Sequence, residues 1–270
     1  MEVKGVRLIY FSPTGTTRRI LESIAEGMGV EDIKHINLTL PEGSRQTLAP
    51  FSDELAIIGA PVYGGRLPVD AVDRFRQLKA GNNLAVLIVV YGNREFEDAL
   101  LELKNLAIEL GFSPVAGGAF IGEHSFATEK VPIANGRPDN LDIQKAINFG
   151  VKVRDKVAAP QFPDATMDLK IPGRFPYEAK GARTMAVAPV TIKESCTVCG
   201  TCAGVCPTAA ISINENVETK IELCIRCCAC IKSCPEKARV MEDEMWKNIA
   251  GWLNKNCTAR KEPQIFGVDM

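Results

Sequence analysis

Apolar and polar residues alternate in a regular way along the first 159 residues of the chain. Short runs rich in branched and aromatic residues predict strands, and the longest runs are apolar throughout, as in strands buried on both faces of a parallel sheet. These runs lie at 6–11, 33–38, 55–62, 84–91 and 115–121. Segments with apolar residues at helical spacing predict helices at 16–28, 69–78, 95–110 and 141–157. Five strands that alternate with helices predict an α/β domain, residues 1–159, on a doubly wound five-stranded parallel sheet.

The remainder of the chain divides into three parts. Residues 160–187 are rich in proline and glycine, which predicts either a tether or an ordered arm over the first domain, with Phe175 and Tyr177 as anchors. Residues 188–240 form a small cysteine-rich unit. Residues 241–270 predict an amphipathic C-terminal helix followed by a tail.

Composition and charge narrow the classes of function. The 270 residues are 46% hydrophobic and 24% charged, as in ordinary globular proteins, and the formal net charge is -1, so we expect no nucleic-acid partner. The longest apolar run, residues 84–90, is too short to span a bilayer, and the N-terminus lacks the pattern of a signal peptide. We therefore expect a cytoplasmic protein without membrane insertion.

Ten cysteines are the strongest chemical feature of the sequence. None precedes Cys196, nine lie between Cys196 and Cys234, and the tenth is Cys257. Each half of the cysteine-rich segment reads C-x2-C-x2-C-x3-C-P, and the second half repeats the first 28 residues later, from 196 to 224 and from 206 to 234. In a chain expected in a reducing compartment, this placement favours metal binding over disulfides.

The spacing of the cysteines is typical of iron–sulfur ligation. In this motif the first three cysteines bind one four-iron cluster and the fourth binds the other cluster. Cluster A would take Cys196, Cys199, Cys202 and Cys234, and cluster B would take Cys224, Cys227, Cys230 and Cys206. A zinc site is the alternative, but zinc commonly takes two separated pairs of ligands, and no histidine lies nearby.

This segment, about residues 190–240, resembles the bacterial ferredoxins that carry two [4Fe-4S] clusters. Two cysteines fall outside the eight predicted ligands. Cys228 takes the place of Gly200 in the repeat, which predicts either a small filler beside cluster B or a replacement for Cys227 in a damaged or three-iron form. Cys257 stands alone and predicts a free thiol.

A candidate phosphate site follows the first predicted strand. The loop Ser12-Pro13-Thr14-Gly15-Thr16-Thr17 opens the first predicted helix, where hydroxyls and backbone N–H groups suit a terminal phosphate. The loop lacks the lysine of a nucleoside-triphosphate loop, and it is not a G-x-G-x-x-G dinucleotide motif. Serine and threonine also cap helices for structural reasons, so the loop by itself leaves both interpretations open.

Two further loops follow predicted strands and would lie at the same edge of the sheet. Each supplies an aromatic residue, Tyr63 or Tyr91, and glycines that let the backbone approach a flat ring. With S-x-T-G-x-T in the first loop, the three loops resemble those of the flavodoxins, which bind FMN there. The resemblance implies that Ser12, Thr14, Gly15, Thr16 and Thr17 hold the phosphate, and that Pro61, Val62, Tyr63, Gly64, Gly65, Tyr91, Gly92 and Asn93 border the isoalloxazine.

The chain departs from well-known flavodoxins because its first ring loop has no tryptophan. The residue that stacks on the flavin therefore stays open. A fourth loop, after the last predicted strand, carries His124, which would meet the ring, the partner domain or solvent.

Together the motifs are similar to those of the flavodoxin–ferredoxin fusion proteins of anaerobes. That resemblance implies an electron-transfer iron–sulfur flavoprotein, which relays electrons between two [4Fe-4S] clusters and FMN and on to or from a redox protein partner. The alternatives are an FMN-dependent oxidoreductase that reduces a small substrate, and a sheet domain that has lost FMN and only docks a partner. No residue is assigned a catalytic role, and the direction of electron flow, the cluster nearer FMN and the oligomeric state stay open.

Overall fold

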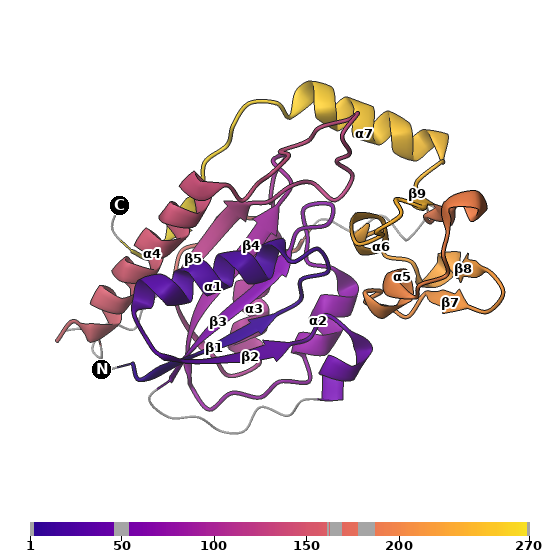
Figure 1. The fold of residues 1–270 in the computed structure, drawn as a ribbon. Helices are drawn as coiled ribbons and strands as arrows, with labels where there is room; N and C mark the ends of the chain where they lie inside the picture. Colours follow the sequence, from indigo (N-terminus) through magenta and orange to yellow (C-terminus); the bar gives the residue numbers. More distant parts are fainter. Residues whose placement is uncertain (1–2, 46–53, 161, 163–168, 178–186, 269–270) are drawn as a thin grey trace.

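A computed structural model describes residues 3–45, 54–160, 162, 169–177 and 187–268 (Figure 1). An α/β unit forms the N-terminal part, and the cysteine-rich unit lies to one side of it, drawn in orange in Figure 1. None of the helices among the described residues combines the length and the hydropathy needed to cross a membrane.

The α/β unit is built on one six-stranded sheet in the order β10-β5-β4-β3-β1-β2. Its parallel strands are β1 (Gly5–Tyr10), β2 (Asp32–Asn37), β3 (Glu54–Pro61), β4 (Leu84–Tyr91) and β5 (Ser113–Ile121). Without β10 this is the order 2-1-3-4-5, which defines the flavodoxin-like version of the doubly wound fold. The predicted α/β class and the five parallel strands are confirmed.

The sixth strand was not expected from the sequence. β10 (Gln264–Phe266) comes from the C-terminal tail and pairs antiparallel with β5, with Ile265 opposite Gly118. Three residues are too few to show a strand periodicity. Only the unpaired edge of β5, with its row of free backbone groups, makes this short segment a strand.

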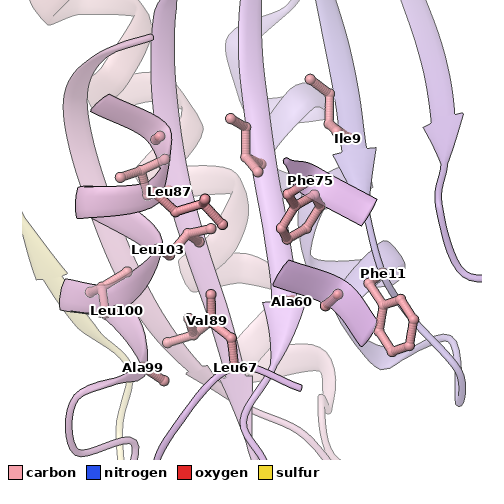
Figure 2. Close-up of a cluster of buried hydrophobic side chains, with 14 of the residues drawn as sticks. Ile9, Phe11, Ala60, Leu67, Phe75, Leu87, Val89, Ala99, Leu100 and Leu103 are labelled. Atoms are coloured by element: carbon pink, nitrogen blue, oxygen red, sulfur yellow. The ribbon is translucent and has the colours of Figure 1, made fainter. Parts of the chain in front are cut away.

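Helices cover both faces of the sheet. α1 (Thr16–Met28) and α4 (Asn140–Ala158) pack on one face, and α2 (Val69–Phe75) and α3 (Ala99–Glu109) pack on the other. Residues of β1 alternate between these two cores, as the strand period requires: Leu8 contributes to the α1/α4 core and Ile9 to the α2/α3 core. Figure 2 shows Ile9 near Phe75 of α2, and Leu100 and Leu103 of α3 beside Leu87.

Part of the proline-rich segment is ordered against the α/β unit. The Tyr177 hydroxyl accepts a hydrogen bond from Asn105 Nδ2 at 2.7 Å, and the Arg66 guanidinium lies 4.2 Å from the centre of the Tyr177 ring. Phe175, in contrast, is 74% exposed and does not serve as an anchor. Residues 161, 163–168 and 178–186 of the predicted linker lie outside the described residues.

The cysteine-rich unit is a small α+β structure with two antiparallel strand pairs. β6 (Val190–Thr191) pairs with β9 (Arg239–Val240), and β7 (Ile211–Ile213) pairs with β8 (Val217–Thr219). The short helices of the unit are η3 (Lys193–Ser195), α5 (Thr201–Gly204), η4 (Ile221–Leu223) and α6 (Ala229–Lys232). The chain then returns toward the sheet through α7 (Glu244–Asn256) (Figure 1). It forms β10 at the edge of the sheet.

Helices α1 and α4 pack backbone to backbone through two glycines. A Cβ atom added at Gly27 would lie 1.9 Å from the carbonyl oxygen of Ile147, and one added at Gly150 would lie 2.0 Å from that of Ile24. Because α1 begins at the candidate phosphate loop, this close packing also fixes the position of that loop.

We expect Gly27→Ala to lower the free energy of unfolding by about 1–3 kcal/mol or more, because the new methyl group must push the two backbones apart. Urea unfolding followed by circular dichroism measures the change. Gly251→Ala is the matched control, since Gly251 lies exposed in α7 with no described atom within 4 Å of an added Cβ. That substitution should be neutral or stabilising by about 0.5–1 kcal/mol. Equal effects of the two substitutions would contradict the close packing.

Candidate functional site

Two cavities in the cysteine-rich unit are each lined by four of the predicted ligands. One cavity is lined by Cys206, Cys224, Cys227 and Cys230, and the other by Cys196, Cys199, Cys202 and Cys234. The fold therefore brings each fourth cysteine to the three cysteines of the other half. We call these groups cysteine set B and cysteine set A.

The two halves of the unit repeat in their backbone conformation as well as in their sequence. Val198 and Arg226, which are equivalent in the repeat, both have positive φ angles, of 54° and 56°. At the next equivalent pair, Gly200 has a φ of 85° and Cys228 a φ of 59°. Such angles are unfavourable for residues with a side chain, so their recurrence indicates that the loops are shaped for a bound group.

Backbone N–H groups point at the sulfur of each crossing ligand. The amide of Ala210 donates to Cys206 Sγ and the amide of Ala238 donates to Cys234 Sγ, both at 3.2 Å. Hydrogen bonds of this kind stabilise the negative charge on cluster sulfurs and tune the reduction potential. The cavities, the loop shapes and these donors fit iron–sulfur clusters.

The described residues contain no group of three His, Cys, Asp or Glu side chains arranged to hold a single metal ion.

The two cysteine sets differ in their access to solvent. In set A, Cys199 is exposed, whereas in set B both Cys227 and Cys230 are buried. Burial raises the pKa of the Cys230 thiol to about 11 and raises that of Cys227 still further. Thiolate ligands at set B therefore require a nearby positive charge, which iron supplies when bound.

A separate cavity lies at the carboxyl ends of the strands in the α/β unit. The loops after β1, β3, β4 and β5 all contribute to it, so it occupies the place where this fold binds ligands. It is lined by Thr14, Thr16, Pro61, Val62, Tyr63, Val90, Tyr91, Gly92, Gly122, Glu123, His124 and Ser125. Seven of these residues are among the predicted FMN contacts.

The loop at the start of α1 has the properties of an anion site. Gly15 adopts a left-handed φ of 81°, and a Cβ added there would meet no described atom within 4 Å. Thr17 Oγ1 is buried and has no hydrogen-bond partner among the described residues. The first turn of α1 contains no acidic residue, so the positive end of the helix dipole is not neutralised. These features fit a phosphate group.

Some residues of the loops after β3 and β4 have surroundings that suit a place beside the isoalloxazine, and others do not. Gly64 has a φ of 59° and open space beside it, whereas a Cβ added at Gly65 would lie 1.6 Å from the Glu97 carboxylate. The Asn93 side chain does not serve the cavity, because its Nδ2 donates to the carbonyls of Cys257 and Ala259 at 2.8 and 2.9 Å. No signal in the sequence links Asn93 to a segment that lies more than 160 residues away.

His124 lies in the cavity and its environment keeps it neutral. A Cβ added at Gly92 would lie 2.3 Å from His124 Cδ2, so the imidazole covers that glycine. His124 Nδ1 accepts a hydrogen bond from the Phe126 amide at 3.0 Å, which leaves the proton on Nε2. Burial, followed by the positive charges of Lys232 and Arg94, lowers the pKa of His124 to about 4.

The set B loop is joined to the α/β unit beside the cavity that holds His124. Lys232, two residues after Cys230, forms an ion pair with Glu123, which lines this cavity. Burial raises the pKa of Tyr63, and the charges of Cys227 and Cys228 raise it further. Arg74 of α2 donates a hydrogen bond to the carbonyl of Pro207, next to Cys206 in the sequence. These contacts place set B at the carboxyl edge of the sheet.

An aromatic pair makes a second connection between the units. Phe126, in the loop after β5, and Trp246 of α7 have ring centres 3.5 Å apart, with the planes tilted by 38°. Cys228 is 2% exposed and packs in the same cluster as Trp246 and Val187. This location agrees with the interpretation of Cys228 as a small filler beside set B.

Comparisons with known proteins separate the two parts of the chain. A family model described as "4Fe-4S binding domain" matches residues 189–212, which include the first four-cysteine motif. The chain is 39% identical over 54 residues to a component of the polysulfide reductase of Wolinella succinogenes, and 38% identical over 60 residues to an uncharacterized ferredoxin of Methanocaldococcus jannaschii. These matches cover 18% and 21% of this chain, and only 28% and 40% of the two relatives.

The α/β unit is similar in structure to flavodoxins. A flavodoxin from the domain Archaea matches 57% of this chain and 99% of its own, with a TM-score of 0.37 and 13% identity. A flavodoxin of Fusobacterium nucleatum bound to flavin mononucleotide matches 57% and 98%, with a TM-score of 0.38 and 17% identity.

The strand order defines a flavodoxin-like fold, and the matched cysteine motif defines an iron–sulfur domain of the ferredoxin type. The chain joins these two domains, as the sequence predicts.

We expect His124 to titrate near pH 4. The proton resonances of the imidazole in a His35→Gln variant measure this directly, because the chain has only two histidines. Since the unfolded chain binds this proton near pH 6.5 and the folded chain does not, folding stability should fall as pH drops from about 6.5 to 4, by roughly 3 kcal/mol. Comparison with His124→Gln isolates this contribution, and identical pH dependence in both proteins would contradict the buried neutral imidazole.

Proposed function

We propose that this protein is an electron-transfer iron–sulfur flavoprotein that binds two [4Fe-4S] clusters and FMN and relays electrons between them. In this proposal set A holds the outer cluster, which exchanges electrons with a redox protein partner, and set B holds the inner cluster, next to FMN. The ion pair between Lys232, two residues after Cys230, and Glu123, which lines the cavity at the sheet edge, is the observation that carries this order.

Three features support the choice of set B as the inner site. Arg74 of α2 donates a hydrogen bond to the carbonyl of Pro207, which lines the set B cavity. Ile225, between two set B cysteines in the sequence, packs against the hydrophobic core on the α2/α3 face. Lys232, which follows Cys230, forms an ion pair with Glu123 of the same cavity. Electron transfer is favoured by such close approach of two sites.

Set A has the opposite surroundings and suits exchange with a partner. Its Cys199 is exposed, and Cys196 also lines an open groove of about 660 Å³ on the surface of the cysteine-rich unit. Exposed apolar side chains border the groove, among them Val190, Val198 and Ile221. A mixed apolar and polar rim of this kind is typical of transient interfaces.

The loops of the α/β unit would hold FMN by its two ends. The N-terminus of α1 and the hydroxyls of Thr14, Thr16 and Thr17 would hold the phosphate, and Tyr63 and Tyr91 would border the ring. FMN, when bound, accepts one or two electrons, whereas each cluster passes one at a time. Neutral His124 would supply an uncharged N–H donor to the cavity.

Substitution of the crossing cysteines tests both the ligand sets and their order. Cys206→Ala should abolish the same cluster signal as Cys227→Ala, and Cys234→Ala the same signal as Cys202→Ala, in EPR spectra of the reduced protein. Loss of the set B cluster should also slow the reduction of FMN by electrons that enter at set A. The order is wrong if loss of the set A cluster alone leaves reduction by a protein donor at its full rate.

Substitution in the α1 loop tests the flavin site. Thr14→Ala combined with Thr16→Ala should reduce the FMN content of the purified protein at least tenfold while the iron content stays unchanged, because only the phosphate contacts are lost. Flavin is measured by absorbance after denaturation, and iron by chelation. Thr208→Ala, in the cysteine-rich unit, is the control and should retain FMN. Full FMN occupancy in the double variant would place the phosphate elsewhere.

A further inference from the structure

Arg239 lies buried between the two cysteine sets. It belongs to β9, is 2% exposed, and is held by neutral oxygens on three sides. Nη1 donates to Thr191 Oγ1 at 2.6 Å, and Nη2 donates to the Pro189 carbonyl at 2.9 Å and to Thr219 Oγ1 at 2.6 Å. Nε is buried and has no hydrogen-bond partner among the described residues.

A buried guanidinium with neutral hydrogen-bond partners is energetically costly unless an anion lies close to it. Arg137, also buried in this chain, has such an anion in the carboxylate of Asp142. For Arg239 the neighbouring anions would be sulfurs. It lines the set A cavity together with Cys202.

Arg239 is placed to act on both cysteine sets. It shares one cavity with the four set A cysteines, and the Pro189 carbonyl and Thr219 hydroxyl that accept its hydrogen bonds belong to residues that line the set B cavity. Its charge therefore favours negative charge on sulfurs of both sets.

We propose that Arg239 is a shared counter-charge for the two clusters and sets their reduction potentials. This inference rests on the proposed pair of clusters. Each reduction adds one electron, and so one negative charge, to a cluster that its four thiolates already make negative. A fixed positive charge in a buried, low-dielectric site stabilises the reduced form more than the oxidised form and raises the potential.

The placement of Arg239 also predicts a difference between the clusters. Arg239 itself lines the set A cavity, whereas it reaches the set B cavity through Pro189 and Thr219. Arg239 should therefore raise the potential of the outer cluster more than that of the inner cluster.

The test is an anaerobic redox titration of the full chain followed by EPR, with iron and flavin quantified in each sample. In Arg239→Gln both cluster midpoints should move to more negative potential. The reduction equilibrium of the set A cluster should change at least tenfold, which corresponds to about 59 mV for a one-electron couple. Arg239→Lys, which keeps the charge, should restore most of the shift, and the FMN midpoints should move less than those of the clusters.

Lys237→Gln is the matched control, because it removes a positive charge three residues after Cys234 from a side chain that is 80% exposed. Solvent screens that charge, so the midpoints should stay close to those of the unaltered protein. Thr219→Asp is a second test for the case in which Arg239→Gln fails to retain clusters. It leaves Arg239 in place but pairs it with a carboxylate, and should also lower both midpoints.

Unchanged midpoints in an Arg239→Gln protein with full iron content would overturn the inference. So would equal shifts in Arg239→Gln and Arg239→Lys, since these would mean a steric effect. If Arg239→Gln holds no clusters, unchanged midpoints in Thr219→Asp would overturn it. Absence of clusters from the unaltered protein would instead refute the proposed function.

Discussion

The contact between the carboxyl edge of the sheet and the loop of cysteine set B is the feature on which the rest of this structure depends. A parallel sheet binds its ligand where its strands end, and Glu123, in the loop after β5, forms an ion pair there with Lys232 at the end of α6. Glu123 therefore belongs to the candidate flavin cavity and also holds the cysteine-rich unit against it.

Several weak connections hold that contact in place, and most of them involve the C-terminal segment. Trp246 of α7 packs on Phe126 of the cavity loop, Asn93 binds the carbonyls that follow α7, and β10 extends the sheet. The chain thus leaves the sheet, forms the iron–sulfur unit and returns to the sheet. The two units are therefore attached to each other at more than one place.

The two cysteine sets differ in solvent exposure and in their charged surroundings. Set B has two buried cysteines, Cys227 and Cys230, whereas set A has an exposed cysteine and an open groove beside it. Arg239 lies between them as a buried cation with neutral hydrogen-bond partners. The same fold can therefore give two chemically similar motifs different surroundings, and different surroundings are what separate the potentials of similar clusters.

The sequence by itself determined the features that depend on local pattern. Apolar periodicity predicted the five parallel strands and the helices between them, and the 28-residue repeat predicted which cysteines group together. Helix ends were less well determined: α3 begins at Ala99 rather than near residue 95, because Glu97 adopts a left-handed φ of 44° just before it.

Only the tertiary structure decided which set lies beside the sheet, the engagement of Asn93 by the C-terminal segment, the strand β10 and the burial of Arg239. These features depend on contacts between residues far apart in the chain, and such contacts leave no periodic trace in the sequence.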